Sequence, residues 1–193
     1  MTVEGQTLTV EEAIRARASV KKFTDRPIRP QEIEQLLELA VQAPNHRMTE
    51  PWQFLVLGDE ARKGYARVLG RRKTKKVEDA EAADMVREKV MRQTLEVPAM
   101  LVVTMDQADD PEIREEDYAA CWMAVQNLCL AAVARGLGTH IKSGAVMDDP
   151  ELREAWRVPD DRRVIAILHL GEPDGEPRHT DRIPATRKTH WLE

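Results

Sequence analysis

Three polar side chains alternate along the segment RASVKKF, residues 17 to 23. Residues at every second position of an extended chain project to the same side, so Arg17, Ser19 and Lys21 would lie together. Two positive charges and a hydroxyl group in that arrangement could form a binding site for a phosphate group. An exposed basic turn is the simpler interpretation of this segment alone, because exposed charges interact only weakly.

Two further groups of polar residues stand where elements are expected to end. The segment IKSG, residues 141 to 144, offers backbone N–H groups, a lysine and a serine at the end of a short strand. Arg182, with Pro184, lies in a charged tail that has few reasons of its own to be ordered. Each of these signals is weak alone, and together they call for a common cause.

Several familiar catalytic motifs are missing from the sequence. The stretch GLGTHI has Ile141 where a dinucleotide-binding fingerprint needs its third glycine, and it follows a helix instead of a strand. There is no G-x-S-x-G around Ser143, no H-E-x-x-H and no P-loop. The histidines, at positions 46, 140, 169, 179 and 190, are dispersed, and each taken alone is interpreted as structural or solvated. We therefore predict no catalytic side chain.

The two cysteines are expected to be reduced core residues. Cys121 and Cys129 lie eight residues apart in one expected helix. This spacing gives a rise of about 12 Å, which is too far for a disulfide bond. No histidine lies near them, so we predict no metal site there.

Hydrophobic periodicity and capping signals predict the elements that must position these residues. Thr9 and Glu12 form a T-x-x-E capping box, which predicts a helix from about Val10 to Ala16, just before RASVKKF. A second helix should begin at Pro30 and end before Pro44. Buried strands are expected at 52–58, 99–105 and 162–171, a short strand within 136–144, and a brief helix over 150–156.

The residues from Glu115 to Gly136 predict a long helix that is apolar on most of its surface. Apart from Gln126 and Asn127, little polar surface remains along the middle of this helix. In so small a protein, a helix enclosed on all sides suggests that a second subunit supplies part of the enclosure.

The stretch 71–95 is highly charged and low in aromatic residues, and is interpreted as a solvated helical excursion with a mobile start. Its beginning, Arg71 to Lys76, raises the alternative of nucleic-acid binding. The acidic overall charge and the lack of interleaved aromatic residues argue against that alternative. A solvent-facing charge run is the preferred interpretation, and one of its cations could reach into a site.

Length, composition and charge describe a soluble globular protein. The 193 residues, 33% charged and 42% hydrophobic, suit a single domain over 1–193 with an extended C-terminal tail from about 172. The net charge of -5 argues against general affinity for nucleic acid or acidic membranes. The N-terminus lacks signal-peptide features, and no apolar run approaches the length of a membrane span, so cytoplasmic residence is expected.

Three motifs, in order along the chain, resemble those of the nitroreductase family of flavin enzymes. RASVKKF is similar to the family's R-x-S-x-[RK]-x-F signature. APNHRMTEPWQFLV, residues 43 to 56, is similar to its A-P-S-x-x-N-x-Q-P-W-x-F-x-V loop, and closest to the short branch that carries A-P-[DN]-H. RIPATRKTHW, residues 182 to 191, matches its R-x-P followed by His-Trp. The resemblance spans about Glu11 to Trp191, and 71–95 is its least comparable part.

This resemblance implies an α+β fold, a three-layer α-β-α sandwich with a mostly antiparallel central sheet, in an intertwined homodimer. FMN would be held noncovalently at the interface, with each site lined by both chains. Arg17 and Arg182 would grip its phosphate, and Ala18 and Ser19 would contact the phosphate and ribityl region. Lys21 would lie near the N1/O2 edge of the isoalloxazine ring, where a cation stabilises the negative charge that reduction creates.

The remaining contacts implied by the resemblance come from two segments. The neighbouring subunit would contribute Gln42, Pro44, Asn45 and His46. The other flank of the ring would be covered by Ile141, Lys142, Ser143 and Gly144.

The chain departs from the family pattern in the loop that includes APNH. Met48 stands where the family has asparagine, and Glu50 stands where it has the glutamine before Pro-Trp. The resemblance therefore does not carry the family's polar contacts over to these two positions. A second lysine, which larger members place beside the flavin, has no located counterpart, and the run Arg71 to Lys76 is only a candidate.

The activity implied by the resemblance is hydride transfer from NAD(P)H through the flavin to a nitroaromatic, a quinone or a related electron-poor acceptor. The cofactor carries this chemistry, which agrees with the absence of a predicted catalytic side chain. The alternatives are a flavin reductase, dehalogenase or dehydrogenase on the same dimer, a non-catalytic flavin-binding protein, and a basic-patch binding module centred on 71–76. The acceptor and the preferred nicotinamide stay open.

Overall fold

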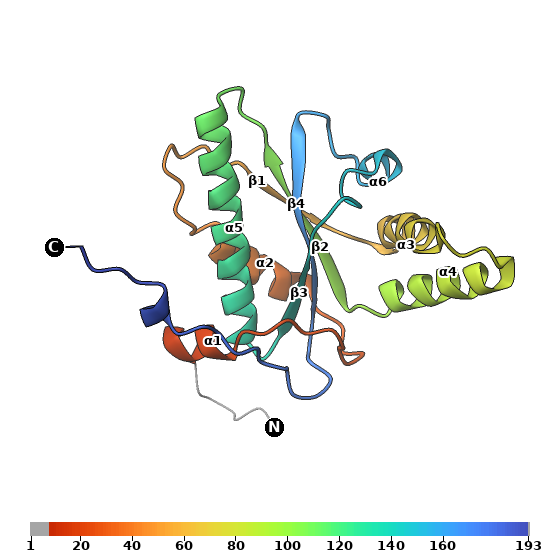
Figure 1. The fold of residues 1–193 in the computed structure, drawn as a ribbon, viewed down its shortest axis with the longest axis horizontal. Helices are drawn as coiled ribbons and strands as arrows, with labels where there is room; N and C mark the ends of the chain where they lie inside the picture. Colours follow the sequence, from red (N-terminus) through yellow and green to blue (C-terminus); the bar gives the residue numbers. More distant parts are fainter. Residues whose placement is uncertain (1–7, 193) are drawn as a thin grey trace.

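The computed structural model describes residues 8–192 of the chain, and Figure 1 shows its elements coloured along the sequence. The helices are α1 (Val10–Ala16), α2 (Pro30–Ala40), α3 (Asp59–Thr74), α4 (Ala80–Leu95), α5 (Pro111–Val133) and α6 (Pro150–Ala155), followed by a 3-10 turn η1 (Ala185–Arg187). The strands are β1 (Trp52–Val56), β2 (Ala99–Asp106), β3 (Gly138–Lys142) and β4 (Arg162–Gly171).

One four-stranded sheet, in the order β1-β2-β4-β3, forms the middle layer. Every neighbouring pair of its strands is antiparallel. The central strands β2 and β4 are buried along most of their length, as their continuous apolar runs predict. The register pairs Val102 with Ile167, and it places His140 on β3 directly opposite His169 on β4.

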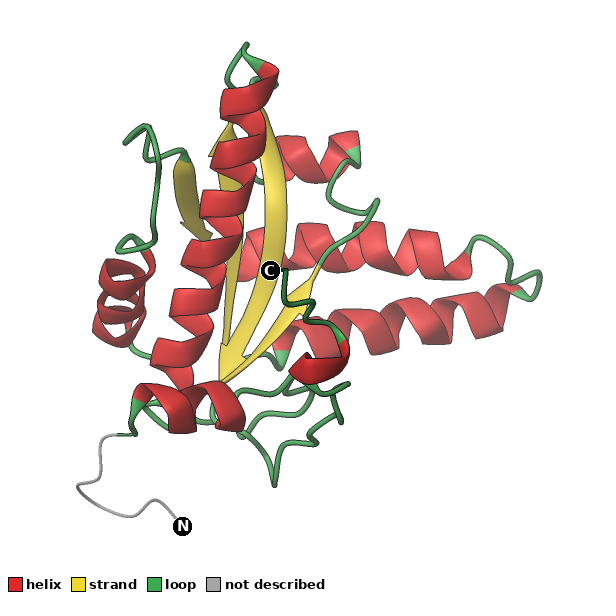
Figure 2. Cartoon of the chain, turned by 60° about the vertical axis from the view of Figure 1, so that its left-hand side comes forward, coloured by secondary structure: helices red, strands yellow, loops and turns green. Residues whose placement is uncertain are grey.

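Helices cover both faces of this sheet (Figure 2). On the face of α2 and α5, Leu36, Leu128 and Leu168 belong to one buried cluster. On the face of α3 and α6, Tyr65 and Trp156 belong to a second cluster. α4 lies beside α3, and the two helices extend together away from the sheet (Figure 1). The expected class, a three-layer α-β-α sandwich around an antiparallel sheet, is confirmed.

Local signals place the first two helices correctly. Thr9 N–H donates to the Glu12 carboxylate at 2.7 Å, and Glu12 N–H donates to the Thr9 hydroxyl at 3.3 Å, which confirms the capping box of α1. Pro30 occupies the first turn of α2, as predicted. Both cysteines are buried and free in α5, which is also as predicted.

β1 differs from the expectation of a fully buried strand. It lies at the edge of the sheet and pairs with β2 alone among the described strands. Gln53 is exposed, and Val56 keeps 52% of its surface exposed. The apolar run is correct for a strand, but it does not tell an edge position from a central one.

Two helices extend beyond the predicted ranges. The sequence patterns do not predict the first turns of α3, because charged residues interrupt its apolar positions, although Tyr65 and Val68 are buried. The charged stretch 71–95 forms the end of α3, a turn and α4. α5 begins at Pro111, earlier than the expected Glu115, because the Asp110 side chain caps its first turn.

No helix in the described part of the chain is long and apolar enough to cross a membrane.

The segment 17–23 lies along the outer edge of β3. Ser19 forms an isolated parallel bridge with Thr139, and Val20 N–H donates to the Thr139 carbonyl at 2.9 Å. The Val20 side chain occupies the space beside Gly138, where an added Cβ atom would lie 2.4 Å from Val20 Cγ2. Glycine at this position therefore permits the close approach of the two segments.

Replacement of Gly138 by serine should destabilise the fold by about 1–3 kcal/mol, because the new side chain has no room beside Val20. Gly58→Ser is the matched control, since a Cβ atom there meets nothing within 4 Å and serine suits the N-cap of α3. Its free energy of unfolding should stay within about 0.5 kcal/mol of the unmodified protein. Urea unfolding at equal protein concentration measures both, and equal losses in the two variants would contradict this packing.

Candidate functional site

A cation-rich pocket of about 480 Å³ lies where segment 17–23, β3, β4 and the C-terminal end of α4 meet. Its lining consists of Lys21, Lys22, Phe23, Gln93, Glu96, Val97, His140, Lys142, His169 and Asp174. Three lysines stand against two carboxylates in this lining, so the pocket carries a net positive charge. An anionic group is the ligand that this charge favours.

Strand geometry explains why these residues meet. His140 and Lys142 are two residues apart on β3 and therefore project to the same face of the sheet. The antiparallel register brings His169 to that face beside His140. Lys21 joins them because the Ser19 bridge fixes segment 17–23 along β3. Two of the predicted site residues, Lys21 and Lys142, thus line one pocket.

The start of the C-terminal tail closes another side of the pocket. Asp174 N–H donates to the Lys22 carbonyl at 3.1 Å, and Thr24 N–H donates to the Glu172 carbonyl at 2.9 Å. These bonds attach the chain after β4 to the segment that carries Lys21. Because that attachment is made by the backbone, it does not depend on the charges in the pocket.

Lys142 lies deep enough for burial to matter. Burial lowers the pKa of its ammonium group below the ordinary value, and the charge of Lys73 on α3 lowers it further. Both causes act against the charged form, so an anionic partner would relieve them.

His140 and His169 form a pair that motif analysis did not select. Their ring centroids are 5.9 Å apart, with an angle of 81° between the ring planes. His169 is 6% exposed, and its Nε2 has no hydrogen-bond partner among the described residues. Burial lowers the pKa of His169 to about 3, and the charge of Lys142 adds to this effect. The register of the two predicted strands is the signal that could have found the pair.

The pKa of His140 is also lowered, first by burial and then by the charges of Lys142 and Lys21. His140 is only half-buried, in contrast to its partner. Both imidazoles are therefore neutral at neutral pH, and they form an uncharged patch among the lysines.

Ser19 lines an adjoining cavity of about 530 Å³ together with Lys21, the tail residues 174–178 and Thr180. Arg178 takes part in this lining. Arg182 lies farther along the exposed tail and makes no ion pair with any residue of 8–192. The other predicted residues of this part, Arg17 and Ala18, directly precede Ser19, and Ile141, Ser143 and Gly144 flank Lys142.

The loop between α2 and β1 is attached to α5 and lies away from this pocket. Arg47 donates to Glu116 at 3.1 Å and to Glu112 at 3.2 Å, and His46 Nδ1 lies 2.9 Å from Glu116. The hydrogen bond from His46, followed by that from Arg47, lowers the pKa of Glu116. Thr49 donates a hydrogen bond to the buried Asp117.

These contacts explain the polar residues that surround the sharp helix-to-strand junction. Asn45 Oδ1 accepts a hydrogen bond from Glu50 N–H at 2.8 Å, which closes the loop on itself. Met48 and Glu50 adopt left-handed backbone angles, with φ of 51° and 45°. A single chain does not bring Gln42, Pro44, Asn45 and His46 to the lysine pocket, which faces α4 on the other side of the sheet.

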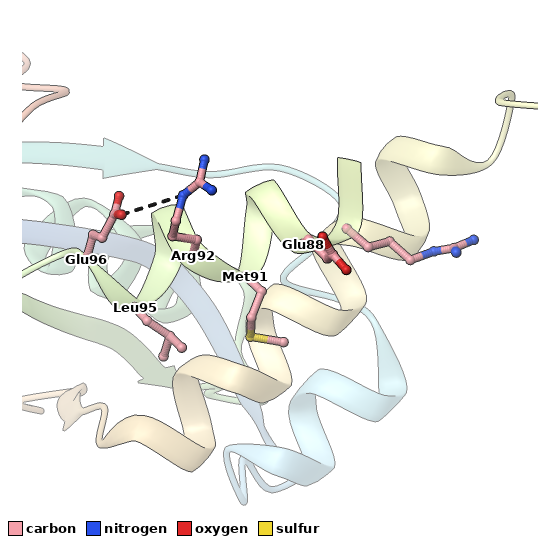
Figure 3. Close-up of a pocket in the computed structure, with 6 residues that line it drawn as sticks. Glu88, Met91, Arg92, Leu95 and Glu96 are labelled. Atoms are coloured by element: carbon pink, nitrogen blue, oxygen red, sulfur yellow. Dashed lines mark ion pairs between the residues drawn. The ribbon is translucent and has the colours of Figure 1, made fainter. Parts of the chain in front are cut away.

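An apolar hollow lies on the outer surface of α4 next to the pocket (Figure 3). Met91 and Leu95 form its apolar part, and Arg92 and Glu96 form an ion pair at 3.7 Å along its border. Glu96 lines both the hollow and the cation-rich pocket. The two surfaces are therefore adjacent.

Part of the basic run 71–76 has a structural role. Arg71 pairs with Asp149 at 3.0 Å and also with Glu151, and Arg72 lies 3.9 Å from Asp149. These pairs connect the end of α3 to the start of α6.

Within residues 8–192, no cluster of three or more acidic, cysteine or histidine side chains is arranged to hold a metal ion.

Comparison with known proteins agrees with this architecture. The family model described as "Nitroreductase family" matches residues 14–172. The chain is 35% identical over 178 residues to "Putative NAD(P)H nitroreductase YfhC" of Bacillus subtilis (strain 168), which covers 91% of this chain and 90% of that protein.

Two solved structures extend the comparison to three dimensions. A nitroreductase-like family protein from Bacillus cereus superposes with a TM-score of 0.85 at 30% identity, covering 99% of this chain and 100% of the other. The NADPH:FMN oxidoreductase of Vibrio harveyi, solved in complex with NAD+, superposes with a TM-score of 0.76 at 22% identity. That match covers 95% of this chain and 77% of the other, and it shows a shared fold.

The stability of the ligand-free protein should depend on pH through His169. Its pKa is about 3 in the folded chain and near 6.5 in the unfolded chain, so only the unfolded state binds a proton between these values. The free energy of unfolding therefore falls as the pH decreases through this window. In His169→Gln, urea unfolding from pH 6.5 to pH 4 should show a shallower fall.

His179→Gln, in the exposed tail, is the matched control and should keep the slope of the unmodified protein. An unchanged slope in His169→Gln would contradict a buried neutral imidazole at this position.

Proposed function

Since this chain belongs to the nitroreductase family and is an oxidoreductase, we propose that it binds FMN in a homodimer and transfers hydride from NAD(P)H to electron-poor acceptors. Nitroaromatic compounds and quinones are the acceptor classes that we propose. The observation that carries the proposal is the convergence of Lys21 and Lys142, which are far apart in the chain, on one cation-rich pocket.

The chemistry of the pocket fits the proposed cofactor. A flavin ring gains negative charge when it is reduced, and the positive charges of Lys21 and Lys142 in this pocket would stabilise it. His169 Nε2 is a buried polar atom of the pocket that has no hydrogen-bond partner among residues 8–192, so a ligand could supply one. The name of the Vibrio harveyi relative, an NADPH:FMN oxidoreductase, supports the choice of FMN.

FMN, when bound, supplies the chemistry by accepting hydride from NAD(P)H and passing it to the second substrate. The residues of this chain then have binding and electrostatic roles. Arg17 and Arg182 hold the phosphate, with Ala18 and Ser19 beside it. Lys21 stabilises the charge of the reduced ring, and the segment Ile141, Lys142, Ser143 and Gly144 supports the ring from its flank.

Exposed apolar side chains support the proposed homodimer. Val10 and Ile14 on α1 are 75% and 55% exposed, and Met123 on α5 is 39% exposed. Trp191 in the tail is 92% exposed. A partner subunit that covered these side chains would remove their apolar surface from water.

In such a dimer, the loop residues Gln42, Pro44, Asn45 and His46 of one subunit would reach the flavin of the other. The attachment of the loop to α5 through Arg47 would hold these residues in a fixed position for that contact. His46 would reach the flavin from its hydrogen-bonded position beside Glu116.

The apolar hollow on α4 is the proposed place for the acceptor. It adjoins the cation-rich pocket through Glu96, and Met91 and Leu95 offer a surface that suits a flat apolar molecule.

Arg182→Gln is expected to weaken FMN binding about 10- to 100-fold, because a charge-assisted hydrogen bond to the phosphate is lost. Arg187→Gln, on the exposed turn η1 of the same tail, is the matched control and should bind FMN like the unmodified protein. Titration of the flavin-free proteins with FMN, followed by flavin fluorescence, gives both dissociation constants. Equal constants for the two variants would remove Arg182 from the phosphate site.

Purified protein loaded with FMN should lose its visible flavin absorbance when NADH or NADPH is added without oxygen. Addition of a nitroaromatic compound or a quinone should then restore the absorbance. The comparison of NADH with NADPH identifies the preferred donor. Bound flavin that neither nicotinamide bleaches would instead indicate a non-catalytic flavin-binding protein.

A further inference from the structure

The His140–His169 pair has no role in the hydride transfer proposed above. The two rings are 5.9 Å apart, they line the cation-rich pocket, and they come from neighbouring strands with a fixed register. A histidine that only fills a core usually has its ring nitrogens hydrogen-bonded. His169 is buried, with only 6% of its surface exposed, and yet its Nε2 lacks such a partner among the described residues.

The charged groups that line the pocket with His140 come from segment 17–23, β3, α4 and the tail, and Lys73 and Arg62 on α3 add positive charge near Lys142 and His169. Positive charge comes from Lys21 and Lys22 on segment 17–23 and from Lys142 on β3 itself, while negative charge comes from Glu96 on α4 and Asp174 in the tail. His169 on β4 faces it as an uncharged neighbour. The balance of these groups is positive, which opposes protonation of His140 for as long as no further negative charge enters the pocket.

We propose that His140 takes up a proton when the flavin in this pocket is reduced and releases it when the flavin is reoxidised. This inference rests on the proposed binding of FMN. Hydride from NAD(P)H brings two electrons and one proton to the ring, which gains one negative charge, and oxidised nicotinamide leaves. A second proton then comes from water to the imidazole of His140. When the acceptor removes the hydride, that proton returns to the solvent or follows the reduced product.

His140 is better suited to this role than the other groups of the pocket. Imidazole is the side chain whose ordinary pKa lies nearest to neutral pH, so a change of one charge nearby can alter its protonation state. Lysine titrates at a much higher pH and carboxylates titrate at a lower one. His169 is more deeply buried than His140, and the loss of its hydration in the charged form keeps it neutral. The half-buried His140 can exchange a proton with water.

The test is the pH dependence of the two-electron reduction potential of the FMN-loaded protein, measured with reference dyes in the absence of oxygen. One proton per two electrons gives a slope of about 30 mV per pH unit. The unmodified protein should exceed this slope around neutral pH and approach the slope for two protons. His140→Gln should return to about 30 mV per pH unit throughout. His179→Gln, in the exposed tail, should behave like the unmodified protein.

A second measurement does not depend on the variant. Photoreduction of the unmodified protein in a weakly buffered solution with a pH indicator should show net uptake of more than one proton per flavin. Uptake of one proton, or a one-proton slope in the unmodified protein, would overturn the role of His140. An equal slope in the unmodified protein and in FMN-loaded His140→Gln would do the same. In both cases FMN would still bind and be reduced, whereas failure of the proposed function would appear as protein that does not retain or reduce FMN.

Discussion

The backbone contact between segment 17–23 and β3 is the constraint on which the pocket depends. The hydrogen bond from Val20 N–H to the Thr139 carbonyl sets the register, and Gly138 leaves the space that the Val20 side chain fills. With this register, Lys21 lines the same cavity as Lys142. A slip by one residue would exchange the faces of alternate side chains and remove that charge from the cavity. The electrostatics of the site therefore follow from a contact between uncharged groups.

The cation-rich pocket holds ionisable side chains whose charged forms are less stable there than in water. Burial and neighbouring positive charge lower the pKa of Lys142 and of His140 together. Like charges held together in this way favour an anionic ligand, because the ligand offsets both the repulsion and the lost hydration. Strongly perturbed ionisable groups in a cavity are typical of functional sites. The same burial and the same positive charges thus lower the pKa of Lys142 and of His140. A bound anion would raise the pKa of both groups.

The loop between α2 and β1 has a separate set of supports on the opposite side of the sheet. Ion pairs from Arg47 to α5 and the hydrogen bond from Thr49 to the buried Asp117 hold it. Met48 and Glu50 have left-handed backbone angles. They also stand where the family motif has asparagine and glutamine, so the loop departs from the motif at its two left-handed positions. A loop that is firmly held but distant from the pocket of its own chain is suited to serve a pocket in a second subunit.

The sequence by itself determined the class of fold, most of its elements and the segments that carry the motifs. The capping box of Thr9, the first-turn Pro30 and the apolar runs of β2 and β4 are properties of contiguous residues, so local rules were sufficient for them. Only the tertiary structure decided that β1 lies at an edge and that His140 meets His169. These facts depend on which strands pair and in what register. Pairing is selected by the burial of side chains that are distant along the chain, and no local pattern records that selection.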